Sequence, residues 1–89
     1  MKCLRIRLLG TVQGVSFRAA VIEEANRREV KGYVHNASDG SVVIEAEGEL
    51  EALKAFLTRC QAGLDVAQVE NIAVEDKSPQ GYERFEIRY

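Results

Sequence analysis

The sequence predicts an α+β fold in which two helices pack on one face of an antiparallel sheet. Five short stretches alternate apolar and polar residues, as strands with one buried face do. Two longer stretches between them repeat their apolar residues at helical spacing. The predicted order is therefore βαββαβ with a short added C-terminal strand. That order is typical of the split βαβ, or ferredoxin-like, sandwich.

The first strand is predicted over residues 2–9 and the first helix over residues 17–28. Ser16 is the expected N-cap of this helix, because a serine oxygen can accept a hydrogen bond from a free amide of the first turn. The apolar residues of the helix form one stripe, and its charged residues are expected on a solvated outer face. Those charged residues are Glu23, Glu24, Arg27 and Arg28.

The second half predicts a hairpin, a helix and two strands. Ser38-Asp39-Gly40 is a hairpin turn signal, and Gly63 is a natural helix stop. The residues of the second helix that we expect to face inward are Leu50, Leu53, Phe56, Leu57 and Cys60. The predicted ranges are 33–37 and 42–47 for the hairpin strands, 50–61 for the helix, and 67–75 and 85–89 for the last strands.

Length and composition indicate one domain over residues 1–89, with 46% apolar and 29% charged residues. The net charge of -2 provides no general basic field that would attract nucleic acid or an anionic membrane. No apolar run approaches the length of a membrane span, and Lys2, Arg5 and Arg7 interrupt the N-terminus, unlike a signal peptide. We therefore expect a cytoplasmic monomer that captures any anionic substrate through a local site.

Cysteine and histidine usage predicts neither a metal centre nor a bound cofactor. Cys3 and Cys60 are far apart in the sequence, and His35 is the only histidine. A disulfide between the cysteines stays open at this stage. Strand alternation places Cys3 on the outer face of the sheet, whereas Cys60 continues the buried stripe of the second helix. This difference favours two free cysteines.

The stretch between the first strand and the first helix is suited to binding an anion. Gly10 and Gly14 permit a curled backbone whose amides point into one concavity. The first amides of the helix have no partner within it, and the positive end of the helix dipole adds to their effect. Arg18 in the first turn opposes that dipole unless an anion lies between them. The alternative is an ordinary strand-to-helix loop with a surface arginine.

Asn36 is the candidate for a second functional group near this loop. It lies just before the hairpin, in phase with Gly32 and Val34, and its amide could both donate to and accept from a water molecule. The alternative is a structural role in starting the turn. The neighbouring His35 alternates to the other face, and we expect it to be a surface strand residue. We likewise expect Glu47 to lie on an outward-facing row.

Three stretches carry a family resemblance. They are Gly10-Thr11-Val12-Gln13-Gly14-Val15-Ser16-Phe17-Arg18, the strand Gly32-Tyr33-Val34-His35-Asn36 with its hairpin, and the tail from Gln80 to Tyr89. The first two resemble the signatures of the acylphosphatase family, Gly-x-Val-Gln-Gly-Val-x-Phe-Arg and glycine-aromatic-valine-x-asparagine. They stand in the family order and at close to the family spacing. The tail is similar to the last strand of the family, so the likeness covers essentially the whole chain.

The resemblance implies hydrolysis of acyl phosphates to a carboxylate and inorganic phosphate without a metal. It assigns phosphate binding to Arg18 and to the loop residues Gly14, Val15, Ser16 and Phe17, and water positioning to Asn36. Ser16 replaces a residue that is often glycine. Ala19 and Ala20 replace larger residues, so we expect a wider mouth to the site and an altered acyl preference.

Two other functions are alternatives to this one. A ferredoxin-like module that binds nucleic acid would need exposed aromatic and basic residues on its sheet, and Glu45 and Glu47 oppose Arg5 and Arg7 there. A regulatory domain that binds carbamoyl phosphate without turnover is the second alternative. Related domains inside larger maturation proteins suggest it by resemblance.

Overall fold

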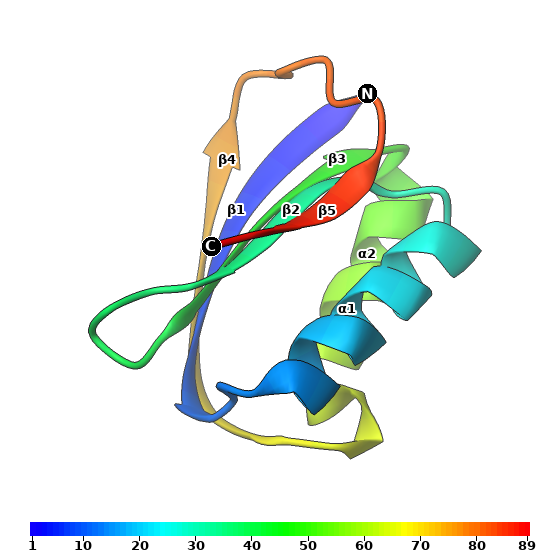
Figure 1. Cartoon of the computed structure of the whole chain (residues 1–89). Helices are drawn as coiled ribbons and strands as arrows, with labels where there is room; N and C mark the ends of the chain where they lie inside the picture. Colours follow the sequence, from blue (N-terminus) through cyan, green and yellow to red (C-terminus); the bar gives the residue numbers. More distant parts are fainter.

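The computed structural model describes residues 1–89, and the predicted order of elements is confirmed (Figure 1). The second helix has the predicted bounds, and the other elements differ from prediction by a few residues at their ends. In chain order the elements are β1 (Lys2–Thr11), α1 (Val15–Arg27), β2 (Lys31–Asn36), β3 (Val42–Gly48), α2 (Leu50–Gln61), the short 3-10 helix η1 (Gly63–Asp65), β4 (Gln68–Lys77) and β5 (Phe85–Arg88).

The five strands form one sheet in the order β4-β1-β3-β2-β5. The pairs β1–β3, β1–β4 and β2–β3 are antiparallel, as predicted for the ferredoxin-like sandwich. The pair β2–β5 is parallel, which corrects the expectation of a wholly antiparallel sheet. The cause is the connection through residues 78–84, which crosses the end of the sheet and brings β5 in from the end where β2 begins (Figure 1).

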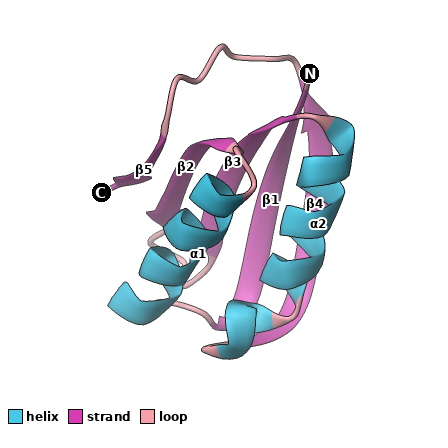
Figure 2. Cartoon of the chain, turned by 90° about the vertical axis from the view of Figure 1, so that its right-hand side faces the viewer, coloured by secondary structure: helices cyan, strands magenta, loops and turns pink.

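Both helices cover the same face of the sheet, and the core lies between them and the strands (Figure 2). Strand residues of even number from β1, β2 and β3 meet the buried stripes of α1 and α2 there. Phe56 of α2 and Phe85 of β5 pack edge to face in this core, with ring centroids 6.1 Å apart. Leu50, which we expected to face inward, is 46% exposed because it occupies the first position of α2, at the rim of the core.

Glu24 is buried, which corrects the prediction that it lies on the solvated face of α1. Its carboxylate accepts a hydrogen bond from Arg27 at 2.9 Å and a second from Arg28. Arg59 of α2 approaches it at 3.8 Å. A buried carboxylate is stable only when it is paired in this way. Through these ion pairs the Glu24 carboxylate links α1 to α2.

The outer face of the sheet is also more enclosed than its polar sequence indicates. Glu45 and Glu47 lie on this outer face, as predicted, but they are buried there. The chain that leads to β5 covers them. The amides of Gln80 and Gly81 donate to the Glu47 carboxylate, and the Tyr82 hydroxyl donates to Glu45 at 2.5 Å. The segment between the last two strands thus forms a second, polar layer on this face.

Cys3 and Cys60 are both free, as predicted, and both are buried, although Cys3 was expected on the outer face of the sheet. Burial raises the pKa of the Cys3 thiol to about 11 and that of the Cys60 thiol to about 12. Nearby carboxylates, Glu47 for Cys3 and Glu24 for Cys60, act in the same direction. Neither thiol is therefore a nucleophile near neutral pH.

Neither helix combines the length and apolar character that crossing a bilayer requires.

Candidate functional site

The loop from Gly10 to Gly14 is shaped by close contact with β4. The pairing of β1 with β4 shifts between Leu9 and Gly10, and Gly10 adopts a φ of 134°. A Cβ atom at this position would lie 2.3 Å from the backbone oxygen of Gln68, so only glycine fits. The bulge turns the chain out of the sheet edge and toward the start of α1.

Helix α1 begins two residues earlier than predicted, and its N-cap is Gly14 instead of Ser16. Gly14 has a φ of 139° and a ψ of 164°, an extended conformation that only glycine adopts easily. Ser16 lies inside the first turn, and no side chain caps the helix. The serine cap fails because the glycine already supplies the change of backbone direction at which a helix starts.

The first turn of α1 presents a row of unpaired amides. The amides of Gly14, Val15, Ser16 and Phe17 have no acceptor in the protein, and the Arg18 amide makes a long bond of 3.4 Å to the Gly14 carbonyl. The first turn holds no acidic residue. Phe17 points its ring into the core, so it offers a ligand only its amide. This is the arrangement of donors that binds a phosphate or another small anion at a helix start.

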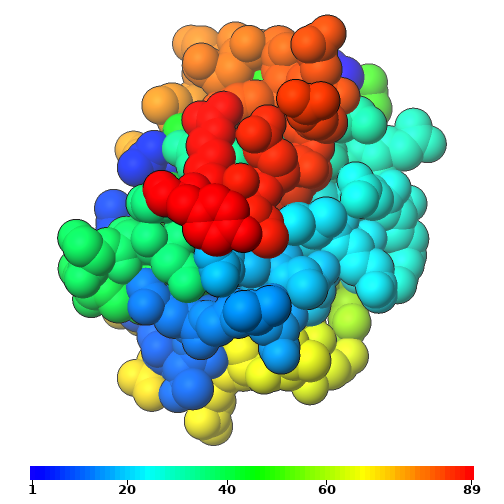
Figure 3. All heavy atoms as spheres, in the orientation of Figure 1, coloured from blue at the N-terminus to red at the C-terminus, as the bar shows by residue number.

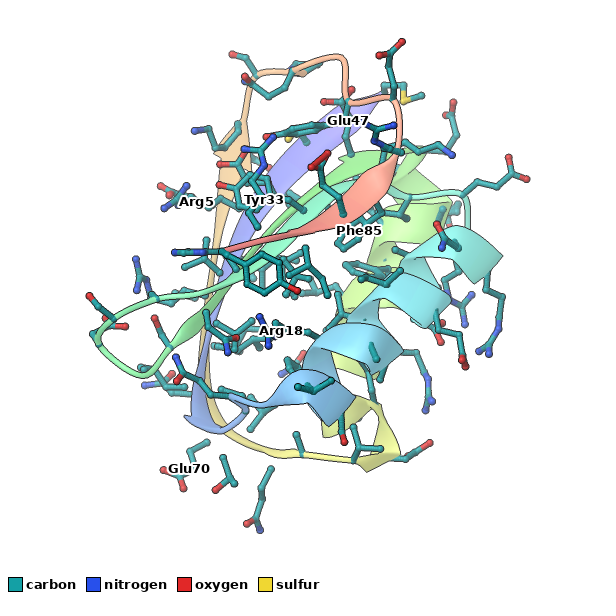
Figure 4. All side chains as sticks on the ribbon, viewed as in Figure 1. Arg5, Arg18, Tyr33, Glu47, Glu70 and Phe85 are labelled. Atoms are coloured by element: carbon teal, nitrogen blue, oxygen red, sulfur yellow. The ribbon has the colours of Figure 1, made fainter.

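Arg18 lies on the side of α1 that faces the sheet and the β2–β3 hairpin (Figure 4). The side chain is half-buried, and its Nε is a buried donor with no hydrogen-bond partner. The guanidinium carbon is 5.3 Å from the centre of the Tyr89 ring. In Figure 3 the red C-terminal residues lie against the blue residues that begin α1. This is a cation–π contact, and it occupies none of the N–H donors of Arg18 with a hydrogen-bond acceptor.

Asn36 is the last residue of β2, and its Oδ1 is buried without a partner. Only two buried side-chain polar atoms in the molecule are unpaired, and they are this oxygen and the Nε of Arg18. An unpaired buried polar atom costs about 1–3 kcal/mol, so two of them call for a functional explanation. One atom is a donor suited to an anion, and the other is an acceptor suited to a water molecule.

Gln13 ties the loop to the strand that carries Asn36. Its Nε2 donates to the carbonyl of Ala37 at 2.8 Å and to that of Ser41 at 3.1 Å. These two carbonyls lie on opposite sides of the hairpin connection, next to the ends of β2 and β3. Gln13 belongs to the first of the family motifs, but the sequence predicted no contact for it. The contact of Tyr89 with Arg18 was not predicted either. Both contacts join segments far apart in the sequence, which local patterns do not reveal.

The ionisable residues near the hairpin are engaged elsewhere. His35 Nδ1 lies 3.2 Å from the Arg88 carbonyl on the adjacent strand. The Ser41 hydroxyl and amide donate to Asp39, which holds the pKa of that carboxyl below its ordinary value, and Arg7 adds to the effect. Glu47 lies at the other end of β3 from the hairpin, and its carboxylate accepts from the backbone amides described above. The carboxylates of Asp39 and Glu47 are thus committed to structural contacts.

Comparison with known proteins gives consistent results. A family model described as Acylphosphatase matches residues 4–87. The acylphosphatase of Thermotoga maritima is 49% identical over 89 residues, which are 100% of this chain and 99% of that protein. The crystal structure of the Bacillus subtilis acylphosphatase superposes with a TM-score of 0.94 at 41% identity and covers all of both chains. Full-length HypF in its phosphate- and nucleotide-bound form gives a TM-score of 0.90 at 30% identity, over 99% of this chain and 12% of that one.

Proposed function

Since this chain belongs to the acylphosphatase family, we propose that it hydrolyses the carboxyl–phosphate bond of acyl phosphates by attack of a positioned water on phosphorus. The products are a carboxylate and inorganic phosphate. Family membership supports acyl-phosphate hydrolysis in general, and the geometry of the site supports the roles that follow. The two side chains assigned roles below, Arg18 and Asn36, come from the same chain, so the mechanism needs no second subunit.

The phosphoryl group binds at the start of α1. Its oxygens accept hydrogen bonds from the free amides of Gly14 to Phe17 and from the guanidinium of Arg18. The positive end of the helix and the fixed charge of Arg18 act together on the same anion. In the loose transition state of phosphoryl transfer, negative charge is spread over the peripheral oxygens. These donors are in place before the reaction, so they stabilise that charge without rearranging.

The attacking water is held by Asn36. The unpaired Oδ1 of Asn36 accepts a hydrogen bond from the water, which orients an oxygen lone pair toward phosphorus. Asparagine does not titrate, so it cannot remove the proton. A phosphate oxygen of the substrate takes the proton as the new P–O bond forms. No carboxylate or histidine is needed as a general base.

The leaving group explains why so few residues suffice. The bond from phosphorus to the acyl oxygen breaks with both electrons going to a carboxylate, which is a weak base. A weakly basic leaving group departs without protonation, so the site needs no general acid. Positioning and charge neutralisation then carry the catalysis, and both come from the loop, Arg18 and Asn36.

One observation carries the proposal. The only two unpaired buried side-chain atoms are a donor on Arg18 and an acceptor on Asn36, the pair of groups that this reaction needs. Gln13 fixes the two segments that bear them. A purely structural arginine and asparagine would instead find partners in the protein, as nearly all buried polar groups do.

Steady-state hydrolysis of benzoyl phosphate in the presence of EDTA tests the proposal. We expect turnover that is unaffected by the chelator and competitively inhibited by inorganic phosphate. Competitive phosphate binding without turnover would instead favour a regulatory, non-catalytic domain. The match to a small part of HypF makes that the second candidate. The match over 99% of the Thermotoga maritima acylphosphatase favours the enzyme.

A further inference from the structure

A cleft of about 450 Å³ opens beside the phosphate-binding loop, between α1 and the segment that connects α2 to β4. Ser16, Ala19 and Ala20 form its wall on α1, and Leu64 and Val66 form much of the opposite wall. Its volume falls within the range of small-molecule sites. The cleft begins at Ser16, and the amide of Ser16 is one of the free donors of the anion site. The two sites are therefore continuous.

The cleft and the water site lie on opposite sides of α1. Ser16, Ala19 and Ala20 recur at spacings of three and four residues, so they share one side of the helix. Arg18 is two residues from Ser16 and from Ala20, which corresponds to a rotation of about 200° around the helix. A phosphate at the helix start thus has the cleft on one side and, on the other, Arg18 with the β2–β3 hairpin that it faces (Figure 4). Asn36 ends β2 beside that hairpin.

Phosphoryl transfer is an in-line displacement, in which the attacking and leaving oxygens lie on opposite sides of phosphorus. With the water held on the side of Asn36, the acyl oxygen must point toward the opposite side. We propose that the acyl group of the substrate binds in the cleft lined by Ala19, Ala20, Leu64 and Val66. This inference rests on the proposed function for the direction of attack.

The chemistry of the walls favours an extended apolar acyl group. Ala19, Ala20, Leu64 and Val66 give the cleft an apolar lining beside Ser16, and Val66 is 55% exposed there. The two alanines leave room that larger side chains would fill. Leu64 and Asp65 adopt left-handed backbone angles, with φ of 52° and 65°, which carry the chain around the opening. Aryl and longer alkyl groups match this space better than an acetyl group does.

The far end of the cleft is charged but offers no free cation. Arg27 is paired with Glu23 and Glu24, and Arg59 is hydrogen-bonded to Asp65 at 3.0 Å. Carboxylates outnumber guanidinium groups in the lining. An acyl group with a terminal carboxylate therefore gains no unpaired partner there. The substrate class that fits is an acyl phosphate with an uncharged acyl group longer than acetyl.

The test uses two stable analogues in which a methylene replaces the bridging oxygen, namely phenacylphosphonate and acetonylphosphonate. Calorimetry measures the dissociation constant of each for the unchanged chain and for Ala20→Leu. We expect Ala20→Leu to weaken phenacylphosphonate about tenfold and to leave acetonylphosphonate within about twofold. Ala55→Leu on α2 is the matched control, and we expect it to change neither. Where Ala20→Leu lowers the melting temperature markedly, Ala19→Leu at the exposed rim takes its place.

Tyr89→Ala tests the competing position for the acyl group, which is beside Tyr89 at the C-terminus. If Tyr89→Ala selectively weakens the binding of phenacylphosphonate, and Ala20→Leu and Ala19→Leu do not, the acyl group lies beside Tyr89 and the inference is wrong. Equal weakening of both analogues by Ala20→Leu also overturns it. Because the readout is binding, an absence of turnover would overturn the proposed function alone and leave this result interpretable.

Discussion

Arg18 and Asn36 differ from the polar residues around them in their hydrogen bonding. Each is partly or fully enclosed, and each has an atom that the fold leaves without a partner. The side chains around them are not short of partners. Gln13 makes two hydrogen bonds, and Asp39 accepts from Ser41. Because the neighbouring polar side chains have partners and these two atoms do not, we assign the two atoms to a ligand.

Removing the charge at Arg18 should impair both binding and turnover. We expect Arg18→Met to raise the inhibition constant of inorganic phosphate and to lower kcat/KM by about 10³-fold, because the arginine contacts the phosphoryl group in the ground state and in the transition state. Arg18→Lys keeps the charge but loses the planar donors, and we expect an intermediate loss. Steady-state kinetics with benzoyl phosphate measures both effects. An unchanged phosphate inhibition constant in Arg18→Met would contradict the assignment.

Removing the amide at Asn36 should act on turnover alone. We expect Asn36→Ala to lower kcat by about 10²- to 10³-fold while the inhibition constant of inorganic phosphate stays nearly constant, because the asparagine contacts only the water. His35→Ala, on the neighbouring outward position, is the matched control and should retain kcat. A rise in the phosphate inhibition constant as large as the loss of kcat would show instead that Asn36 binds the phosphoryl group.

At the scale of elements, the site depends on glycines that let backbone segments approach each other. Gly32 in β2 has a φ of 142°, and a Cβ atom there would lie 1.8 Å from the backbone carbonyl oxygen of Glu45 in β3. Gly10 makes a similar approach to β4. Strand β2 carries Asn36 at its end, so the close pairing at Gly32 positions the strand that bears the amide for which we propose a catalytic role.

Gly32→Ala should therefore destabilise the fold strongly. We expect a loss of about 3 kcal/mol or more in the free energy of unfolding, because both the left-handed φ and the backbone contact oppose a side chain. Gly40→Ala in the hairpin is the control, since it also has a positive φ of 94° but nothing within 4 Å of the added Cβ. There the expected loss is about 1 kcal/mol. Urea denaturation followed by circular dichroism compares them, and equal losses would show that the contact with Glu45 is unimportant.

At the scale of the whole molecule, charged residues are buried on both sides of the apolar core. Glu24 joins the two helices, and Glu45 joins the outer face of the sheet to the segment before β5. Burial opposes ionisation of Glu45, but hydrogen bonds from Tyr82 and Arg5 outweigh it and hold its pKa below the ordinary value of 4.5. Both carboxylates anchor segments that are distant in the sequence.

The lowered pKa of Glu45 makes stability depend on pH in a defined direction. A carboxyl whose pKa is lower in the folded state stabilises the fold above its unfolded pKa, and this stabilisation is lost as the pH falls below about 4.5. We expect Glu45→Gln to reduce the free energy of unfolding by about 1–3 kcal/mol at pH 7, with the difference shrinking toward pH 3. Urea unfolding at several pH values measures this difference.

Glu75→Gln is the control for this experiment. Glu75 is exposed and lies 3.7 Å from Arg5, which it shares with Glu45. We expect its replacement to change stability by less than about 1 kcal/mol at every pH, because solvent screens an exposed pair. A pH-independent difference between the unchanged chain and Glu45→Gln would contradict the role given to the Glu45 charge.

Local patterns predicted the elements well, because helix and strand periodicities are written into neighbouring residues. The bounds of α2 were predicted correctly since its stripe and the following Gly63 are both local signals. The burial of Glu24, Glu45 and Glu47 was not predicted, because the groups that bury them, such as Arg59 and Tyr82, come from distant segments. The parallel pairing of β5 was missed for the same reason.

At the site, the sequence singled out Arg18 and Asn36 as candidates but did not predict the contacts that position them. The motif residues alone left both an ordinary loop and a turn-starting asparagine open, and the family resemblance assigned the roles. The start of α1 was placed two residues too late because Ser16 is a good cap in isolation, whereas Gly14 is the cap in the fold. The contacts of Gln13 and Tyr89 depend on pairing between remote segments, so no local signal could have revealed them.

The destination of the oxygen atom of the attacking water distinguishes attack on phosphorus from attack on the carbonyl carbon. Benzoyl phosphate is hydrolysed by the enzyme in ¹⁸O-enriched water, and both products are analysed by mass spectrometry. Attack on phosphorus, with the water held by Asn36, predicts that the label enters inorganic phosphate and that benzoate stays unlabelled. Label in benzoate would mean attack on the carbonyl carbon, and would contradict the roles given to the α1 amides, Arg18 and Asn36.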